Sequence, residues 1–252
     1  MKACSHISQR DPFVVALQAA MLLLVAQIGF SAGGDFHAGL NAYRSGDCPR
    51  AAEVWSKHSQ LQPASGTFIN LGLAEWHLGR RGPAVLAWER ALWVDPFNAD
   101  ARENLRFARK AAQLEAPTLT WFEAASLWLP INAWALVAGI SLWAAVAFVT
   151  LPRILRWRRA NWQQALAAAG FAIFLLCLPS LYGINTRSRL GIVLEKETEL
   201  RLTPTRSAQT MMLLPAGQPA RWERARGEYL LIRTGYGQGW IERSQLGLVC
   251  PK

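Results

Sequence analysis

Residues that could carry out catalysis or bind a metal are few in this chain of 252 residues, and their spacing matches no known site. The four cysteines form no CxxC pair, and the Cys and His positions do not follow zinc-site spacing. Three of the four histidines fall at helical positions in one region, with no Asp or Cys spaced to act with them. P-loop, HExxH, GxGxxG, nucleophile-elbow and paired-carboxylate motifs are also missing from the sequence. We therefore expect no enzymatic activity, no cofactor and no metal.

The composition points to a membrane protein. Hydrophobic residues make up 52% of the chain and charged residues 17%, which is too apolar for an ordinary soluble domain. The net charge is +10, but the basic residues are spread along the chain instead of being gathered in one segment. We therefore expect no nucleic acid partner. The densest basic cluster lies between two apolar runs and is better explained as a topology signal; it consists of Arg153, Arg156, Arg158 and Arg159.

The first apolar run, residues 13–30, follows a short basic segment and ends in small residues. This pattern is typical of a secretory signal peptide, to which we assign residues 1–31. An uncleaved membrane anchor is the alternative. Either one directs the chain that follows out of the cytoplasm.

Two further apolar segments, residues 127–151 and 165–183, contain no charged residue and are long enough, or nearly so, to cross a lipid bilayer. We expect two transmembrane helices joined by a cytoplasmic loop, residues 152–164, because short loops rich in Arg stay in the cytoplasm. The parts on either side then lie outside the cytoplasm. A buried helical hairpin of a soluble domain is the alternative. A transporter subunit is disfavoured because neither segment carries an ionisable residue in its interior.

Five positions in residues 32–64 recur 33 residues later in residues 65–98. They are Gly39, Gly46, Ala51, Trp55 and Pro63, which correspond to Gly72, Gly79, Ala84, Trp88 and Pro96. This spacing resembles tetratricopeptide repeats, in which two antiparallel helices form one unit. The resemblance implies that the helices of each unit cross closely at a glycine and that a tryptophan fills the space between them.

Residues 99–115 resemble the first helix of a third repeat, but Arg106 stands where the repeat has its glycine. A bulky side chain there prevents a second helix from crossing closely, so we expect a capping helix that ends the array. In such arrays the first helices line a groove that binds an extended segment or an amphipathic helix of another protein. Some of these residues could instead pack against the cap or the membrane helices. The expected groove residues are Leu40, Tyr43, Arg44, Ile69, Leu73, Trp76, His77, Glu103, Phe107 and Lys110.

Between residues 190 and 248 the pattern changes to short alternating strands separated by turns at Pro215, Gly227 and Gly235. We expect a small antiparallel barrel. The segments ELRLTPT, LLPAGQPARW and GWIERSQL are similar to bacterial SH3-like modules, which contact cell-wall peptides or proteins. The candidate contact residues are Trp222, Tyr236 and Trp240, although a core position is favoured for Trp240.

The order of these parts resembles the BatE-type proteins of the Bacteroides aerotolerance (Bat) operons over nearly the whole chain. The fold class expected is a multidomain membrane protein with an α-helical tetratricopeptide solenoid, a two-helix transmembrane hairpin and a small all-β SH3-like barrel. The resemblance implies a non-enzymatic component of the bacterial inner membrane. It also implies partners, a MoxR-type ATPase and von Willebrand A domain membrane proteins, in envelope maintenance or stress tolerance.

Two functions are compatible with this organisation. The leading hypothesis is a periplasmic scaffold that binds protein partners through both the groove and the SH3-like module, so that each contact strengthens the other. The alternative is a sensor that binds peptidoglycan through the SH3-like module. With either function Cys48 and Cys250 would lie in an oxidising compartment, and a disulfide between them is left open.

Overall fold

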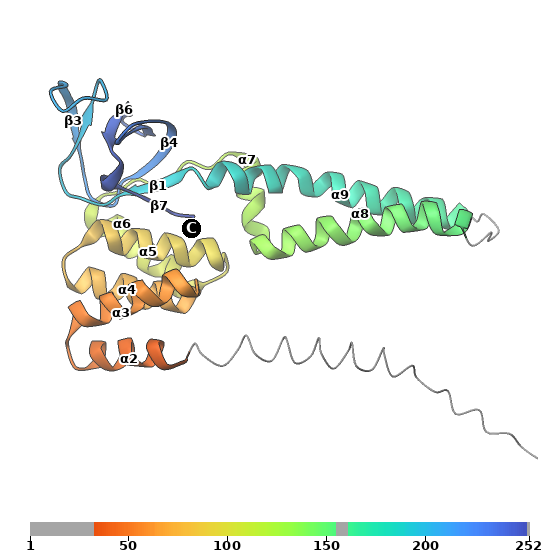
Figure 1. Ribbon diagram of the computed structural model, residues 1–252, viewed down its shortest axis with the longest axis horizontal. Helices are drawn as coiled ribbons and strands as arrows, with labels where there is room; N and C mark the ends of the chain where they lie inside the picture. Colours follow the sequence, from red (N-terminus) through yellow and green to blue (C-terminus); the bar gives the residue numbers. More distant parts are fainter. Residues whose placement is uncertain (1–32, 155–160, 251–252) are drawn as a thin grey trace, which may run out of the picture.

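The computed structural model describes residues 33–154 and 161–250, which form a helical array, a long helical hairpin and a β-sheet (Figure 1). The array consists of α2 (Gly33–Arg44), α3 (Cys48–Leu61), α4 (Ser65–His77), α5 (Arg81–Val94) and α6 (Ala99–Ala112). The short helix α7 (Trp121–Ala125) and the 3-10 turn η1 (Ser126–Trp128) lead to α8 (Ile131–Ile154) and α9 (Asn161–Arg187). The expected signal peptide, residues 1–31, lies outside the described residues, as do residues 155–160 of the expected loop.

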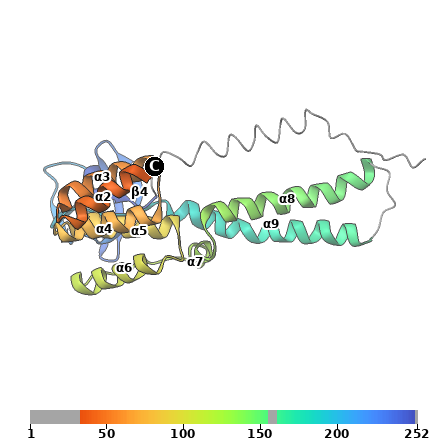
Figure 2. The same cartoon turned by 90° about the horizontal axis from the view of Figure 1, so that it is seen from below.

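Consecutive helices of the array run antiparallel and pack side by side in layers (Figures 1 and 2). Gly46 and Gly79 form the turns between α2 and α3 and between α4 and α5. Their φ angles of 82° and 74° are ones that residues with a side chain rarely adopt. Asp47 and Asn98 begin α3 and α6, where each side chain accepts a hydrogen bond from a backbone N–H of the first helical turn.

The close helix crossings expected at two glycines are confirmed. A Cβ at Gly39 would overlap the indole ring of Trp55, and a Cβ at Gly72 would overlap that of Trp88. Each indole N–H also donates a hydrogen bond to a carbonyl oxygen of the preceding helix, at 3.3 Å for Trp55 and 3.2 Å for Trp88. The pairs α2–α3 and α4–α5 therefore repeat one packing arrangement with the spacing seen in the sequence.

The helices α8 and α9 pack against each other along their length and are long and apolar enough to cross a membrane (Figure 1). Small residues bring them together, since a Cβ at Gly170 of α9 would lie 2.9 Å from the carbonyl oxygen of Ser141 of α8. Large apolar side chains such as Ile140, Trp143 and Leu176 are exposed. Such an outward surface is suited to contact with lipid.

The two hairpin helices differ in extent from the expected segments. Helix α8 begins at Ile131 and not at residue 127, because Pro130 has no N–H and restricts the residue before it. Leu129 is accordingly extended, with φ −142° and ψ 153°, and residues 127–128 belong to η1. Helix α9 continues beyond both ends of the expected segment, from Asn161 to Arg187, and accommodates Pro179.

The C-terminal part forms one antiparallel sheet of seven strands in the order β3-β2-β6-β5-β4-β1-β7. The strands are β1 (Leu190–Val193), β2 (Thr198–Arg201), β3 (Thr210–Leu214), β4 (Pro219–Arg226), β5 (Tyr229–Thr234), β6 (Gly237–Glu242) and β7 (Leu246–Leu248), and the 3-10 turn η2 (Arg243–Gln245) precedes β7. Gly227 and Gly237, with φ of 58° and 146°, lie at the expected turns. The expected antiparallel sheet is present.

Trp240 lies outside the buried core cluster of the sheet. Ile241 fills the core of the sheet with Leu230 and Ile232, whereas Trp240 is half-buried and pairs with Leu231 of β5. Neighbouring residues of a strand point to opposite faces, so Trp240 lies on the face opposite this core. The register of β5 and β6 decides whether Trp240 or Ile241 faces the core, and the sequence pattern did not determine this register.

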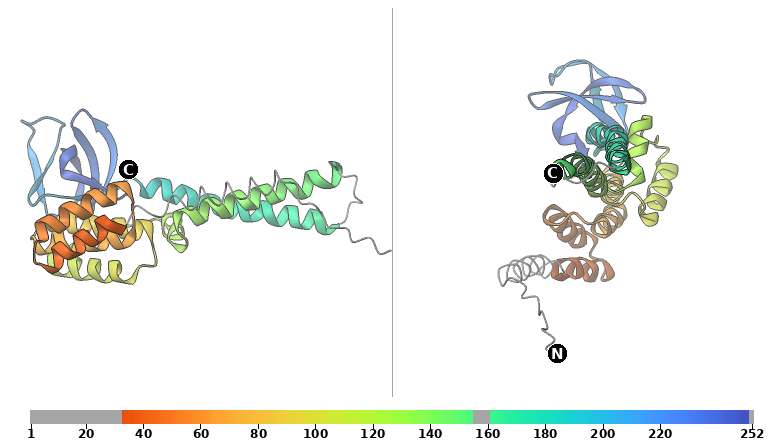
Figure 3. Two further views of the ribbon diagram at one scale, coloured as in Figure 1. Left: turned by 60° about the horizontal axis from the view of Figure 1, so that its bottom comes forward. Right: turned by 90° about the vertical axis from the view of Figure 1, so that its right-hand side faces the viewer.

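The array and the sheet do not form separate cores. Val85, Leu86 and Trp88 of α5 belong to the same buried cluster as Leu190 and Ile192 of β1. The backbones of α5 and of the segment after β1 also approach closely, since a Cβ at Gly82 of α5 would overlap the backbone of Leu194. The β-sheet therefore lies directly on α5, at the end of the molecule from which the hairpin extends (Figures 1 and 3).

Candidate functional site

The residues expected to line a groove lie on α2, α4 and α6, which are the first helices of the two pairs and the helix that follows them. We call this surface the A-helix face. It consists of Leu40, Tyr43 and Arg44 on α2, Ile69, Leu73, Trp76 and His77 on α4, and Glu103, Phe107 and Lys110 on α6.

Aromatic contacts link the three helices across the A-helix face. The ring of Tyr43 on α2 meets that of His77 on α4 edge to face, with the centroids 5.7 Å apart. Trp76 on α4 meets Phe107 on α6 in the same manner at 5.6 Å. The structure thus brings residues from three separate helices into one surface.

The A-helix face has a buried and an exposed layer. Tyr43 is half-buried and packs on the core around Trp55, and Trp76 is half-buried against Trp88, with ring centroids 5.8 Å apart. Phe107, by contrast, is 59% exposed. The remaining residues divide in the same way: Leu40, Ile69 and Leu73 are half-buried against the array core, and Arg44, His77, Glu103 and Lys110 are exposed.

The hydroxyl of Tyr43 keeps its proton at neutral pH. Burial raises the pKa of this group, and the nearby Cys48 adds to the shift. The hydroxyl can therefore donate a hydrogen bond to a carbonyl or carboxylate oxygen of a bound segment.

The three aromatic residues expected to form a contact site on the sheet do not come together. Trp222 of β4 pairs with Ile232, and the guanidinium of Arg189 lies 5.7 Å from the centre of its ring. Trp240 lies on the opposite face, and Tyr236 is exposed in the turn between β5 and β6. The sheet thus presents these rings in separate places.

A buried polar cluster that the sequence pattern does not predict lies where the array, the hairpin and the sheet meet. Glu123 of α7 is fully buried and accepts hydrogen bonds from the Arg221 guanidinium of β4, at 2.5 Å and 3.0 Å to its two oxygens. Arg187 of α9 donates to Oγ of Ser126 at 3.0 Å, and its guanidinium lies 5.0 Å from the centre of the Trp93 ring of α5. The cluster joins α5, α7, α9 and β4.

The pKa values of two carboxyl groups near this cluster are shifted in opposite directions. Burial by itself raises the pKa of Glu123, but hydrogen bonds from Arg221, the Thr120 N–H and Thr186 lower it to about 2. Burial raises the pKa of Glu89 on α5, and the ion pair with Arg109 only partly opposes this. Glu123 is therefore charged at neutral pH.

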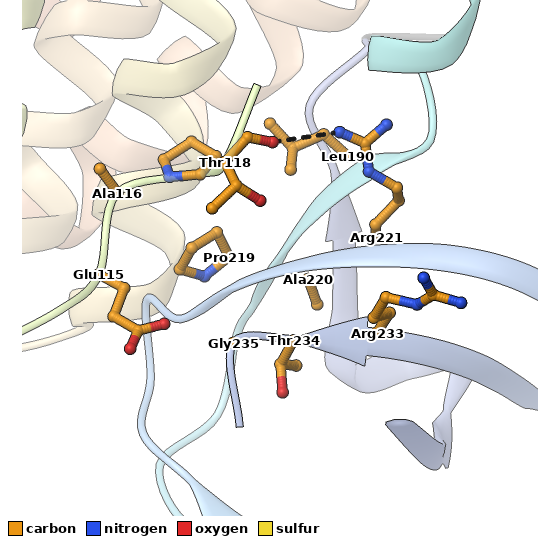
Figure 4. A pocket seen from close by; sticks show the side chains of 11 residues that line it. Glu115, Ala116, Thr118, Leu190, Pro219, Ala220, Arg221, Arg233, Thr234 and Gly235 are labelled. Atoms are coloured by element: carbon orange, nitrogen blue, oxygen red, sulfur yellow. Dashed lines mark hydrogen bonds between the residues drawn. The ribbon is translucent and has the colours of Figure 1, made fainter. Parts of the chain in front are cut away.

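A small pocket lies beside the cluster, between residues 115–118 and strands β1, β4 and β5 (Figure 4). Its volume of about 120 Å³ is below the roughly 300 Å³ at which ligand pockets begin. Arg221 donates to the carbonyl oxygen of Thr118 at 3.4 Å and also pairs with Glu123, while Arg233 pairs with Glu223 at 2.7 Å. Because both cations face carboxylates, we assign this pocket a structural role.

Within residues 33–154 and 161–250, no three His, Cys, Asp or Glu side chains are gathered in the way that a metal ion requires. In the same part of the chain, Cys48 and Cys250 form no disulfide with each other. The A-helix face is thus the candidate site with exposed aromatic and charged groups. No protein-family model matches the chain, and no curated protein matches it at a significant level.

Proposed function

We propose that this protein is a membrane-anchored scaffold without enzymatic activity, whose A-helix face binds a segment of a partner protein outside the cytoplasm. In this proposal the array is a tetratricopeptide solenoid and the sheet is an SH3-like barrel that makes a second protein contact. The observation that carries the proposal is the continuous surface formed by the contacts Tyr43–His77 and Trp76–Phe107 across three helices.

The chemistry of the exposed layer suits a peptide that carries both apolar and charged side chains. Phe107 is held against Trp76 but remains 59% exposed, so an apolar side chain of a partner can bury it further. Glu103 and Lys110 lie one turn before and after Phe107 on the same helical face. These charges would orient the segment, while the half-buried layer beneath keeps the surface rigid.

The proposed location is supported by the two apolar helices and by the Arg-rich loop between them. A thiol reagent that cannot cross membranes tests it in the full-length chain. In a chain whose native cysteines are replaced, cysteines introduced at Ser45 in the array and at Ser244 in η2 should react in intact cells. A cysteine at Arg158 in the loop should react only after lysis. The reverse pattern would place both binding surfaces in the cytoplasm and refute the proposed location.

Photo-crosslinking tests the A-helix face directly. A photoreactive amino acid at Phe107 should form a discrete crosslink to another membrane or periplasmic protein. The matched control is Glu53, which is exposed on α3, a second helix of the repeat pair. Crosslinks of equal yield at both positions, or none at Phe107, would count against a binding role for the face.

The partners proposed from the resemblance to Bat proteins are von Willebrand A domain membrane proteins that work with a MoxR-type ATPase in envelope maintenance. Mass spectrometry of the Phe107 crosslink identifies the partner. Adding the Lys110→Glu substitution separates specific binding from random contact. Reversing this charge should lower the yield of the Phe107 crosslink if binding is specific. A crosslink to a protein of another class would leave the scaffold role intact and remove the Bat assignment.

A further inference from the structure

The two ends of the helical array differ in chemistry. Among residues 33–112, the exposed large apolar side chains are those of Leu61, Phe97 and Phe107, and Phe107 belongs to the A-helix face. Leu61, 77% exposed, ends α3 at its loop to α4, and Phe97, 57% exposed, lies in the loop from α5 to α6. Because consecutive helices run antiparallel, these two loops lie at the same end of the array (Figure 1).

The opposite end is polar. It contains Ser45, Gly46 and Asp47 in the turn between α2 and α3, Arg80 in the turn between α4 and α5, and Arg81 as the first residue of α5. By contrast, residues 61–66 and 95–98 contain one charged residue, Asp95, whose carboxylate accepts a hydrogen bond from the N–H of Phe97 at 3.0 Å. Of the two ends of the array, one therefore carries exposed large apolar side chains and the other does not.

This apolar end lies beside the base of the hairpin. Trp93, near the end of α5, contacts Arg187 near the end of α9, and Ile131 and Ile184 at the base of the hairpin pack on the core that contains Trp93. Phe97 lies four residues after Trp93 in the chain. The axes of the array helices also run along the hairpin axis (Figures 1 and 3). The helix ends, and not their sides, thus face the direction in which the hairpin extends.

The residues around this end are of the types that are enriched at the interface between a bilayer and water. Trp121 of α7 and Trp128 of η1, in the segment that leads into α8, are exposed. Arg102 is exposed and donates a hydrogen bond to the carbonyl oxygen of Phe97 at 2.7 Å, which places a cation beside the backbone of this residue. Exposed aromatic rings and Arg side chains are typical of the phospholipid headgroup region.

We propose that Leu61 and Phe97 form a membrane-contact surface. Through this surface the array contacts the same bilayer that α8 and α9 span. This inference rests on the proposed membrane location of the hairpin. The occupant is the phospholipid headgroup region, into which the two side chains insert while Arg102 meets the phosphates. The A-helix face, on the side of the array, then remains open to protein partners.

Fluorescence quenching by nitroxide lipids tests the proposal in the full-length chain, reconstituted into nanodiscs of phosphatidylcholine and phosphatidylglycerol. Single cysteines at Leu61 or Phe97 carry the fluorophore, in a background with Cys4, Cys48 and Cys250 replaced by Ser and Cys177 by Ala. Nitroxides near the headgroup should quench both labels strongly. Matched labels at Ser45 and Arg81, on the opposite end, should keep their fluorescence.

A fifth label, at the exposed Leu176 of α9, separates failure of this inference from failure of the proposed location. Quenching at Leu176 by deep nitroxides without quenching at Leu61 and Phe97 would overturn the membrane-contact surface alone. No quenching at Leu176 would overturn the membrane location and the contact surface together. Equal quenching at Ser45 and Phe97 would also overturn the inference, because both ends of the array would then meet lipid.

Photolabelling of the unmodified chain provides a measurement that does not depend on the cysteine substitutions. A phospholipid with a diazirine in its headgroup is activated in the same nanodiscs, and labelled tryptic peptides are sequenced by mass spectrometry. Labels are expected at Leu61 and at Phe97 and not at residues 45–47 or 79–81. Labels confined to the hairpin would contradict the proposal.

Discussion

The guanidinium of Arg90 on α5 donates two hydrogen bonds to the carbonyl oxygen of Leu248 on β7, at 3.1 Å from Nε and 2.9 Å from Nη2. The contact links the helical array to a strand 158 residues further along the chain. Together with the buried cluster formed by α5 and β1, it makes the array and the sheet one packing unit.

Loss of the Arg90 side chain should loosen this contact. We expect Arg90→Met to lower the free energy of unfolding by about 2 kcal/mol, because two hydrogen bonds from a charged donor are lost. Arg81→Met is the matched control, since Arg81 is exposed, and should change stability by less than about 0.5 kcal/mol. Urea unfolding in detergent measures both. Equal stability of the two variants would show that the Arg90 contact contributes nothing.

Two glycines of α4 should respond in opposite directions to the same substitution. Gly72→Ala should destabilise the protein by about 3 kcal/mol, because the added Cβ overlaps the buried ring of Trp88. Gly66→Ala meets no atom within 4 Å and should stabilise the helix by up to about 1 kcal/mol. Thermal unfolding distinguishes them. If both variants melted at the same temperature, the crossing at Gly72 would not be as close as described.

The ion pair of Glu123 and Arg221 predicts a pH dependence. At neutral pH we expect Glu123→Gln to cost about 3 kcal/mol, because Arg221 loses its buried carboxylate. The pKa of Glu123 is lowered from 4.5 to about 2, so the stabilisation is complete above about pH 5 and declines as the pH falls toward 2. The stability difference between wild type and variant should shrink over that range.

Comparing the two proteins at each pH isolates Glu123 from Glu89. The raised pKa of Glu89 has the opposite sign, favouring the folded state at low pH, but it acts in both proteins and cancels in the difference. A difference that stayed constant from pH 7 to pH 3 would refute the role assigned to the ion pair.

The sheet should be a poor independent domain. A fragment of residues 190–252 leaves Leu190, Ile192 and Val249 without the α5 side chains that cover them in the whole chain. We expect the fragment to bind a hydrophobic dye and to self-associate, as measured by fluorescence and analytical ultracentrifugation. A monomeric fragment that binds no dye and unfolds cooperatively would contradict a core that depends on α5.

The helix pairs of the array could be predicted from the sequence because their constraints are local. Gly72 and Trp88 lie 16 residues apart and recur with Gly39 and Trp55 at the same separation, so one steric requirement appears twice in the sequence. Tyr43 and Phe107 were placed on the A-helix face by the same repeat alignment. The role of that face in binding stays a prediction.

The buried cluster could not be predicted, because ion pairing over long separations leaves no periodic signal. Glu123 and Arg221 are 98 residues apart, and each is an ordinary charged residue in its own segment. The start of α8 was predictable in principle, since Pro130 was present within the apolar run. The orientation of Trp240 depended on strand register, which a shift of one residue reverses.

The packing of the sheet on α5 has a consequence for biosynthesis. The residues of β1 and β7 that cover Leu86 are translated only after both hairpin helices have been translated. Until then the array carries an uncovered apolar side, which a chaperone or the translocation machinery must shield from aggregation. Closure of the α5 core is thus a late step, and it requires the segments before and after the hairpin to lie on the same side of the bilayer if the hairpin spans a membrane as proposed.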